Sequence, residues 1–283
     1  MKIVRKNTGR GHYYIDVDTG ERVPGVTTIL GDGLPKKALI NWAANATAEY
    51  AIDRWDELTA LTPSERLKKL QGGRYAAKDE AANRGTAVHK MGERLMAGER
   101  VTVPDALTGY VDSYVRFLDE FKLRVRHIEA LVYSVTHRYV GTLDIFGDIL
   151  LPDMPEYDDL PRDDDGFVCN CLIDAKTNRS GIFGETALQL AGYRFAEFMQ
   201  PDPADPGTAF EMPEVTWTGA VWIRPDGYSL IPVTAGEEQH RQFLYAQQVG
   251  IFDAGARDLV GERIEPPTAS RYMLAKAGEE ATR

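Results

Sequence analysis

The strongest constraint on the fold is a block of three β-rich stretches that follows a helix-rich first half. The stretches cover 128–135, 139–150 and 167–176, they are rich in β-branched and aromatic residues, and turn or polar segments separate them. Three consecutive strands of this kind predict an antiparallel meander. A connected sheet is therefore expected at the centre of the chain.

Helices and hairpins flank this block. Before it, the sequence predicts a small hairpin made by 12–17 and 22–24 and four helical segments, at 38–55, from Pro63, at 74–97 and at 105–122. After it, the sequence predicts a helix over 185–199, a hairpin around Pro225-Asp-Gly and a closing helix over 236–255. This order favours one α/β or α+β domain over 1–283, with a hairpin and helical region over 1–124, a core over 125–255 and a tail over 256–283 that frays from about Tyr272.

Composition bounds the class of protein. The 283 residues are 43% hydrophobic, enough for a large core, and no apolar run of about 18 residues predicts a membrane span. The polar start, Met1 to Arg10, does not read as a signal peptide, so a cytoplasmic protein is expected. Cys169 and Cys171 are expected to be reduced core residues, because zinc and iron–sulfur sites take about four ligands.

The charge of the chain speaks against a nucleic-acid partner. The formal net charge is -10 and the pI is near 5.1, whereas proteins that hold duplex DNA are usually basic. Seven acidic residues lie between Asp153 and Asp165, where a solvated loop is expected, and carboxylates that bind metal add to the total. An acidic scaffold without a nucleic-acid role fits this balance best.

A possible metal site appears at the ends of two predicted strands. Asp174 and Lys176 are two residues apart, so they share one face of the strand, and Asp144 begins an apolar stretch on the strand before. Two carboxylates with the carbonyl of Ala175 would offer oxygen ligands of the type that Mg²⁺ prefers, and Lys176 would lie beside the attacking water. An Asp-x-Lys triplet on its own is more often a solvated strand end.

The combination of several short motifs in a fixed order carries more weight than any one of them. The motifs are Arg84-Gly-Thr-Ala-Val-His89, Gly141-Thr-Leu-Asp144, Asp174-Ala-Lys176 and Gln189-Leu-Ala-Gly-Tyr193, with Glu129 on the strand before Gly141. In this order they resemble the PD-(D/E)XK nuclease superfamily and, within it, the RecB-like phage exonucleases. The first hairpin and the later hairpin near Trp222 extend the resemblance over nearly the whole chain.

The resemblance implies a fold and a chemistry. It implies a restriction-endonuclease-like core, a central mixed sheet flanked by helices, in which His89, Asp144, Asp174 and the Ala175 carbonyl hold one or two Mg²⁺ or Mn²⁺ ions. Lys176 would then assist the nucleophile, Gln189 and Tyr193 would act on a phosphate or base, and Glu129 would be a further acid of the site. The function implied is a DNA nuclease, most simply an exonuclease, in phage or bacterial recombination, repair or processing.

Partners and cofactors follow from the same resemblance. DNA is the expected substrate, with a single-strand annealing protein or a helicase as candidate partner, because the chain has no phosphate-binding loop of its own. The CRISPR-adaptation branch carries an iron–sulfur cluster on four cysteines, and with two this chain is expected to bind none. The alternative is a DNA-binding or recombination-accessory protein on the same fold that no longer cuts.

Four further assignments depend on position alone. Glu93, one helical turn after His89, is either a substitute metal ligand or a solvated acid, and the solvated acid is the favoured interpretation. Arg179 and Arg194 are candidates for contacts to the DNA backbone. Trp42, Trp55, Tyr50 and Tyr75 could stack on unpaired bases, but most of them are expected in the core.

Overall fold

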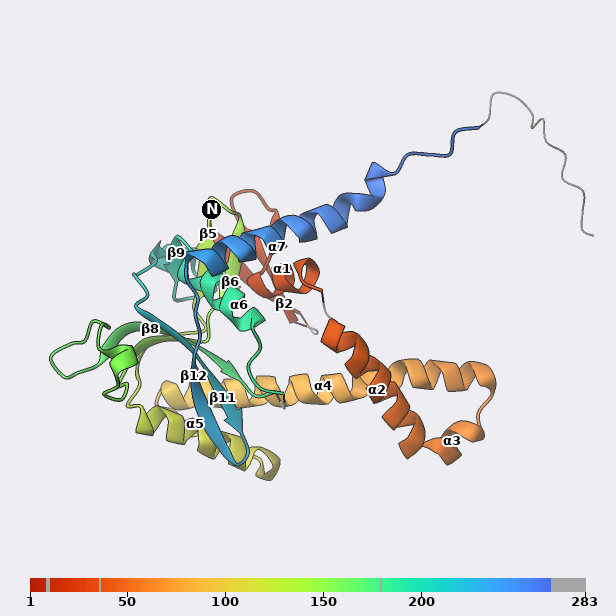
Figure 1. Cartoon of the computed structure of the whole chain (residues 1–283), viewed down its shortest axis with the longest axis horizontal. Coiled ribbons are helices and arrows are strands. Elements are labelled where there is room, and N and C mark those ends of the chain that lie inside the picture. Colours follow the sequence, from red (N-terminus) through yellow and green to blue (C-terminus); the bar gives the residue numbers. More distant parts are fainter. Residues whose placement is uncertain (9–10, 36, 179, 266–283) are drawn as a thin grey trace, which may run out of the picture.

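The chain is described by a computed structural model that covers residues 1–8, 11–35, 37–178 and 180–265, with the backbone alone at 37–39 and 74–82. It has a mixed α+β fold with three sheets, in the strand orders β1-β2-β3, β10-β9-β5-β6 and β12-β11-β8-β7-β4 (Figure 1). The expected mixed sheet flanked by helices is confirmed. No helix in the described part of the chain is long and apolar enough to cross a membrane.

The strands are β1 (Ile3–Thr8), β2 (Gly11–Asp16), β3 (Arg22–Val23), β4 (Arg124–Ile128), β5 (Leu131–Ser134), β6 (Tyr139–Thr142), β7 (Ile145–Ile149), β8 (Val168–Lys176), β9 (Phe198–Gln200), β10 (Phe210–Glu211), β11 (Trp217–Arg224) and β12 (Gly227–Pro232). The helices are α1 (Val26–Gly33), α2 (Lys37–Asp53), α3 (Trp55–Thr59), α4 (Pro63–Met96), α5 (Thr108–Glu120), α6 (Glu185–Arg194) and α7 (Glu237–Gly255).

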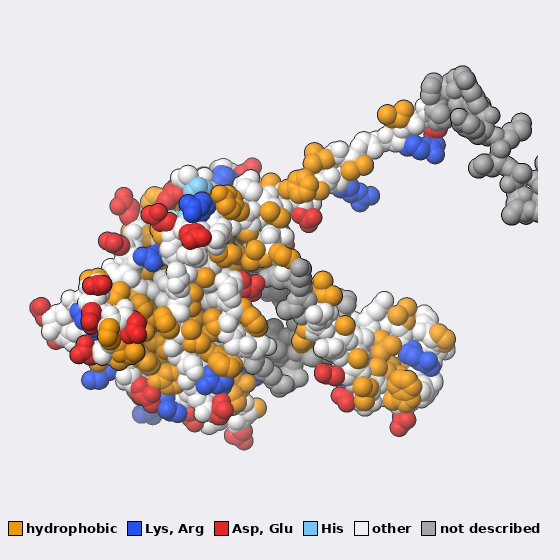
Figure 2. Space-filling model, in the orientation of Figure 1, with side chains coloured by type: hydrophobic (Ala, Val, Ile, Leu, Met, Phe, Trp, Pro, Cys, Tyr) orange, Lys and Arg blue, Asp and Glu red, His pale blue; other side chains and the backbone are white. Residues whose placement is uncertain are grey.

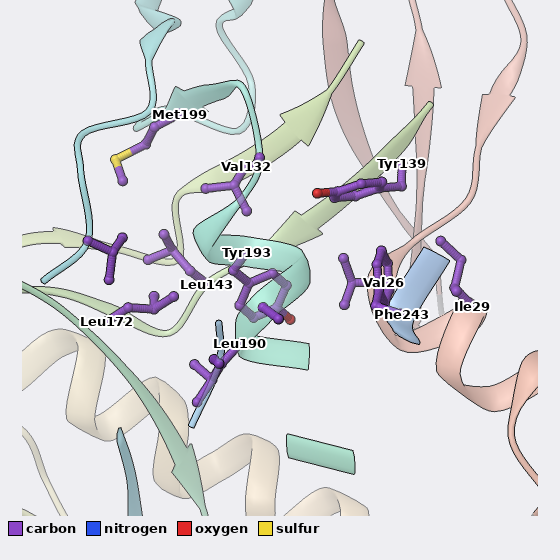
Figure 3. Packing of buried hydrophobic residues seen from close by; sticks show 14 of the residues in the cluster. Val26, Ile29, Val132, Tyr139, Leu143, Leu172, Leu190, Tyr193, Met199 and Phe243 are labelled. Carbon is purple, nitrogen blue, oxygen red and sulfur yellow. The ribbon is translucent and has the colours of Figure 1, made fainter. Parts of the chain in front are cut away.

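The five-stranded sheet lies between two helical layers. On β8, Cys171, Ile173 and Ala175 pack with residues of α4 and α5 in one core cluster, whereas Leu172 packs with residues of α1, α6 and α7 in another (Figure 3). The period of two along a strand explains this division, because alternate side chains point to opposite faces. By the same alternation Asp174 and Lys176 lie on the face that α6 covers.

Two of the predicted strands are broken, and the break places their halves in different sheets. The stretch 128–135 is divided between β4 and β5, and 139–150 is divided between β6 and β7. Glu129 stands at the first break with a left-handed backbone (φ 52°), which non-glycine residues rarely adopt. Across the bend the Glu129 N–H still donates to the Asp144 carbonyl, at 3.2 Å. The expected meander is therefore present as a bent antiparallel ribbon, with β4, β7 and β8 adjacent in the five-stranded sheet.

The two helices expected from Pro63 and over 74–97 are a single helix, α4. Its N-terminus has the Thr62–Glu65 capping box and Pro63 in the first turn. Gly73 inside the helix allows close packing, because a Cβ there would lie 2.5 Å from the Tyr50 ring of α2. The helix expected over 185–199 instead ends at Arg194, since 198–200 form strand β9 against β5, with Phe198 stacked on Tyr133.

Part of the region 1–124 packs into the hydrophobic core around the sheets, and part of it extends away (Figure 1). Helix α1, which the sequence did not predict, contributes Val26, Ile29 and Leu30 to the cluster with α6 and α7. By contrast, α2, α3 and the first part of α4 extend away from the sheets, as does the end of α7 (Figure 1). Trp42 and Trp55 are 39% and 63% exposed there, so their expected place in the core is wrong. Hydrophobic side chains are visible on the surface of this outer helical part (Figure 2). The expected fraying from Tyr272 lies outside the described residues.

Candidate metal centre

All eight residues that the sequence proposed for the site line a single cleft of about 650 Å³. They reach it from α4, from the bend in the ribbon, from the end of β8 and from α6. The eight are His89, Glu129, Asp144, Asp174, Ala175, Lys176, Gln189 and Tyr193. Residues far apart in the sequence are thus brought together by the packing of α4 and α6 against the two strands.

The bend in the β-ribbon positions two of the acids. Asp144 follows the end of β6 and Glu129 follows the end of β4, so each stands where its strand leaves one sheet for the other. The register of β7 with β8 pairs Ile145 with Ile173, which places Asp144 beside Asp174. Glu129 is linked to Asp144 through its backbone. Three carboxylates therefore meet at the point where the ribbon bends.

Asp174 is the centre of a polar network. Its side chain is 1% exposed, and its Oδ1 accepts hydrogen bonds from Lys176 Nζ at 2.9 Å and from Gln189 Nε2 at 2.8 Å. The Lys176 ammonium also lies 2.7 Å from Oδ2 and donates to Gln189 Oε1 at 3.2 Å. Gln189 Nε2 further donates to the Tyr193 hydroxyl at 3.1 Å. Gln189 and Tyr193 are one turn apart on α6, so a single helix face supplies both.

Tyr193 is fixed by close packing as well as by hydrogen bonds. Its ring lies in the core between α6 and the strands (Figure 3). A Cβ at Gly141 would lie 2.3 Å from this ring, so the glycine makes room for it. The Gly141-Thr-Leu-Asp144 motif and the Gln189-Leu-Ala-Gly-Tyr193 helix are therefore in direct contact, although they are far apart in the chain.

His89, Glu129 and Asp144 form a group of metal-ligating type. One ligand atom from each lies within 4.8 Å of the others, and His89 Nδ1 is 4.0 Å from Asp144 Oδ2. The backbone N–H of Ala175 donates to that same Asp144 oxygen at 2.7 Å. In an extended strand the N–H and C=O of one residue point to the same side, so the Ala175 carbonyl also faces Asp144.

Burial shifts the protonation of the groups in the cleft. Desolvation raises the pKa of Asp144 to about 6; His89 opposes this shift and the neighbouring Asp174 adds to it. Burial also disfavours the charge of Lys176, but the carboxylates of Asp174 and Asp144 outweigh it and raise the pKa of the ammonium. Lys176 is therefore a protonated donor. Burial raises the pKa of Tyr193 far above its usual value, so that residue remains a neutral phenol.

The donor set fits a divalent cation. Mg²⁺ and Mn²⁺ take carboxylate and carbonyl oxygens, and Mn²⁺ accepts an imidazole more readily than Mg²⁺ does. In the described residues the buried Oδ2 of Asp174 has the ammonium of Lys176 beside it but accepts no hydrogen bond, so it retains a lone pair for a ligand. His89, Glu129 and Asp144 lie close enough together to supply further ligand atoms to an ion, and the Ala175 carbonyl is on the same side.

The structure adds residues to the cleft beyond the eight that the sequence proposed. Glu93 lines it and is half-buried, which corrects its assignment as a solvated acid; burial, with Glu129 next in effect, raises its pKa. Its spacing of four residues from His89 was the available signal. Arg5 and His12 enter from the N-terminal hairpin, and no local pattern in the sequence marks them.

Of the two arginines considered for DNA contacts, Arg194 is not among the described residues that line this cleft. Arg194 lies near the start of α7, where its Nη1 donates to the Ala235 carbonyl at 3.4 Å. Arg179 lies outside the described residues. Cys171 is buried in the core cluster with α4 and α5, Cys169 is half-buried, and both are free thiols.

Comparison with known proteins adds no family to these observations. No protein-family model matches the chain, and no curated protein does. The function of the chain is therefore inferred from the geometry of the cleft and from the order of the motifs that line it.

Proposed function

We propose that this chain is a metal-dependent DNA nuclease of the PD-(D/E)XK superfamily, similar to the RecB-like phage exonucleases, that hydrolyses phosphodiester bonds with Mg²⁺ or Mn²⁺. The observation that carries the proposal is the meeting of four separate motifs in one cleft, around a buried acid and a paired lysine. A chance Asp-x-Lys triplet at a solvated strand end would have neither a buried aspartate nor a histidine and two further carboxylates beside it.

The chain's own residues suggest a division of labour. His89, Asp144, Asp174 and the Ala175 carbonyl would hold the ion. Glu129 would be a further ligand, since its carboxylate lies with His89 and Asp144 in the metal-ligating group. When bound, the ion would polarise the phosphate and lower the pKa of a water molecule. The cleft's acidic character is then partly neutralised, which reconciles an acidic chain with a polyanionic substrate.

Lys176 would orient the nucleophile and stabilise negative charge in the transition state. Its raised pKa keeps it protonated, so it is a hydrogen-bond donor and not a general base. Asp174 and Gln189 fix its position through contacts of 2.7 to 3.2 Å. Tyr193 accepts a hydrogen bond from Gln189, which leaves its hydroxyl proton free to donate to a phosphate oxygen.

The test is a cleavage assay with end-labelled linear, circular and single-stranded DNA, in Mg²⁺, in Mn²⁺ and in EDTA. We expect degradation with either metal and none in EDTA. Loss of linear DNA with circular DNA intact would identify an exonuclease. Lys176→Ala should abolish cleavage. Lys2→Ala is the matched control. It removes a lysine that lies just before β1, outside the cleft, with a side chain that is 68% exposed, and this variant should retain cleavage.

Two results would contradict the proposal. Binding of DNA without cleavage in any divalent metal would favour a DNA-binding or recombination-accessory protein on the same fold. If the protein neither binds nor cleaves DNA, it would instead be an acidic protein without a nucleic-acid role.

A further inference from the structure

The N-terminal hairpin is a fixed wall of the cleft. Ile3 of β1 is fully buried, and its carbonyl accepts a hydrogen bond from the Gln200 side chain at 3.1 Å. On β2, the Tyr14 hydroxyl is 2.8 Å from Thr142 Oγ1, two residues before Asp144, and His12 Nε2 is 2.9 Å from the same hydroxyl. The hairpin is thus tied to the ribbon next to the metal-ligating group.

Arg5 on β1 extends into the cleft from this wall. Its Nη1 donates to Glu129 Oε2 at 3.0 Å and its Nε to Asn7 Oδ1 at 3.3 Å. Among the described residues Nη2 has no hydrogen-bond partner. The side chain is 23% exposed, so the guanidinium is largely enclosed, and its Nη1 and Nε contacts hold it in place.

The charges that line the cleft leave Arg5 as the best placed cation for an anionic ligand. Among the residues that the structure describes, three lysine or arginine side chains line it, and the comparison is made between these three: Arg5, Lys90 and Lys176. Lys176 is already bound to Asp174 and Gln189, and Lys90 is an exposed side chain on the surface of α4. Arg5 alone is both held in position and able to make another hydrogen bond.

Glu129 links Arg5 to the metal-ligating group. One carboxylate oxygen of Glu129 contacts Arg5, and Glu129 also belongs to the group with His89 and Asp144. Arg5 therefore lies a single carboxylate away from an ion bound there. Guanidinium groups bind phosphate through two or more N–H donors and retain their charge when enclosed.

We propose that Arg5 forms a phosphate-binding subsite, in which Nη1 holds Glu129 and Nη2 donates to a non-bridging oxygen of the DNA phosphate at the metal. This inference rests on the proposed nuclease function and adds a substrate contact from an element outside the four motifs. Arg5 would couple the metal ligand to the substrate, and the hairpin would be part of the active site.

The test compares Arg5→Ala with Lys6→Ala, which removes the next cation along the same strand from an exposed position outside the cleft. In Arg5→Ala, kcat/KM for DNA cleavage should fall roughly 10- to 100-fold, the range of one charge-assisted hydrogen bond. The salt dependence of DNA binding should become shallower by about one phosphate contact. Lys6→Ala should keep kcat/KM close to that of the wild type, and Arg5→Lys should recover part of the loss, since it keeps the charge but not the planar fork.

Binding of Mn²⁺ without DNA, measured by calorimetry, separates this role from a purely structural one. If Arg5 acts on the phosphate, Arg5→Ala should leave the affinity for Mn²⁺ unchanged or make it tighter, because a positive charge beside Glu129 is removed. If Arg5 only orients Glu129 as a metal ligand, Arg5→Ala should weaken the affinity for Mn²⁺. Weaker Mn²⁺ binding with unchanged affinity for DNA would overturn the inference, and so would equal cleavage by Arg5→Ala and the wild type. A wild type that neither binds nor cuts DNA would overturn the proposed function as well, so the two failures are distinguishable.

Discussion

Replacing Asp144 by asparagine should stabilise the metal-free protein even though it removes a metal ligand. Burial raises the pKa of Asp144 from 3.8 to about 6, a difference of about 2 units. At about 1.4 kcal/mol per unit, ionisation of this carboxyl costs the fold about 3 kcal/mol. The side chain is 18% exposed, and solvent reduces this cost. Asparagine can still accept the 2.7 Å hydrogen bond from the Ala175 N–H, so a gain of about 1–3 kcal/mol is expected.

The gain should depend on pH with a definite sign. Below about pH 4 the carboxyl is protonated in both the folded and the unfolded chain, and the substitution has little effect. Between pH 4 and 6 the folded chain binds the proton more tightly than the unfolded chain, so the stability of the wild type falls as the pH rises. Above pH 6 the full difference between wild type and Asp144→Asn is reached.

Urea unfolding in EDTA, followed by tryptophan fluorescence at pH 5 and pH 8, measures this difference. Saturating Mn²⁺ should then reverse the order, because a ligand at 100 times its Kd stabilises the wild type by about 2.7 kcal/mol and the variant by less. An Asp144→Asn protein that is less stable than the wild type in EDTA at pH 8, or a gain as large at pH 5 as at pH 8, would refute the reasoning.

Two further substitutions test the packing of the site. Lys176→Ala leaves Asp174 buried without its cation, so the free energy of unfolding in EDTA, measured with urea, should fall by roughly 3 kcal/mol. Adding Asp174→Asn removes the unpaired charge and should restore most of that stability. A double variant as unstable as Lys176→Ala would contradict the assignment of a charge pair. Gly141→Ala should push against the Tyr193 ring, 2.3 Å from the new Cβ, lower the stability by about 1–3 kcal/mol and reduce cleavage; an unchanged Tm would contradict that contact.

The local parts of the site were predictable from the sequence. Asp174 and Lys176 are two residues apart on one strand, and Gln189 and Tyr193 are one turn apart on one helix, so strand and helix periods alone place each pair on a common face. The class of fold followed in the same way from the order of β-rich and helical segments, and it is confirmed.

The parts that depend on long-range geometry were not predictable. The bend at Glu129 requires a left-handed backbone at a residue that has no preference for it, so the sequence indicated one straight strand where two sheets meet. The sequence indicated two helices, from Pro63 and over 74–97, where the structure has the single helix α4, in which Gly73 allows the Tyr50 ring to pack closely. Arg5 is 124 residues away in sequence from Glu129, its partner in the cleft, and only the packing of the hairpin brings the two together.

The most direct test of the central claim is to measure Mn²⁺ binding by calorimetry and the rate of DNA cleavage over the same range of Mn²⁺ concentration. If the ion held by this cluster does the cutting, the half-maximal rate should fall near the calorimetric Kd, and His89→Ala should shift both curves to higher Mn²⁺ together. Cleavage that does not depend on Mn²⁺ or Mg²⁺, or a His89→Ala protein with both curves unchanged, would contradict it.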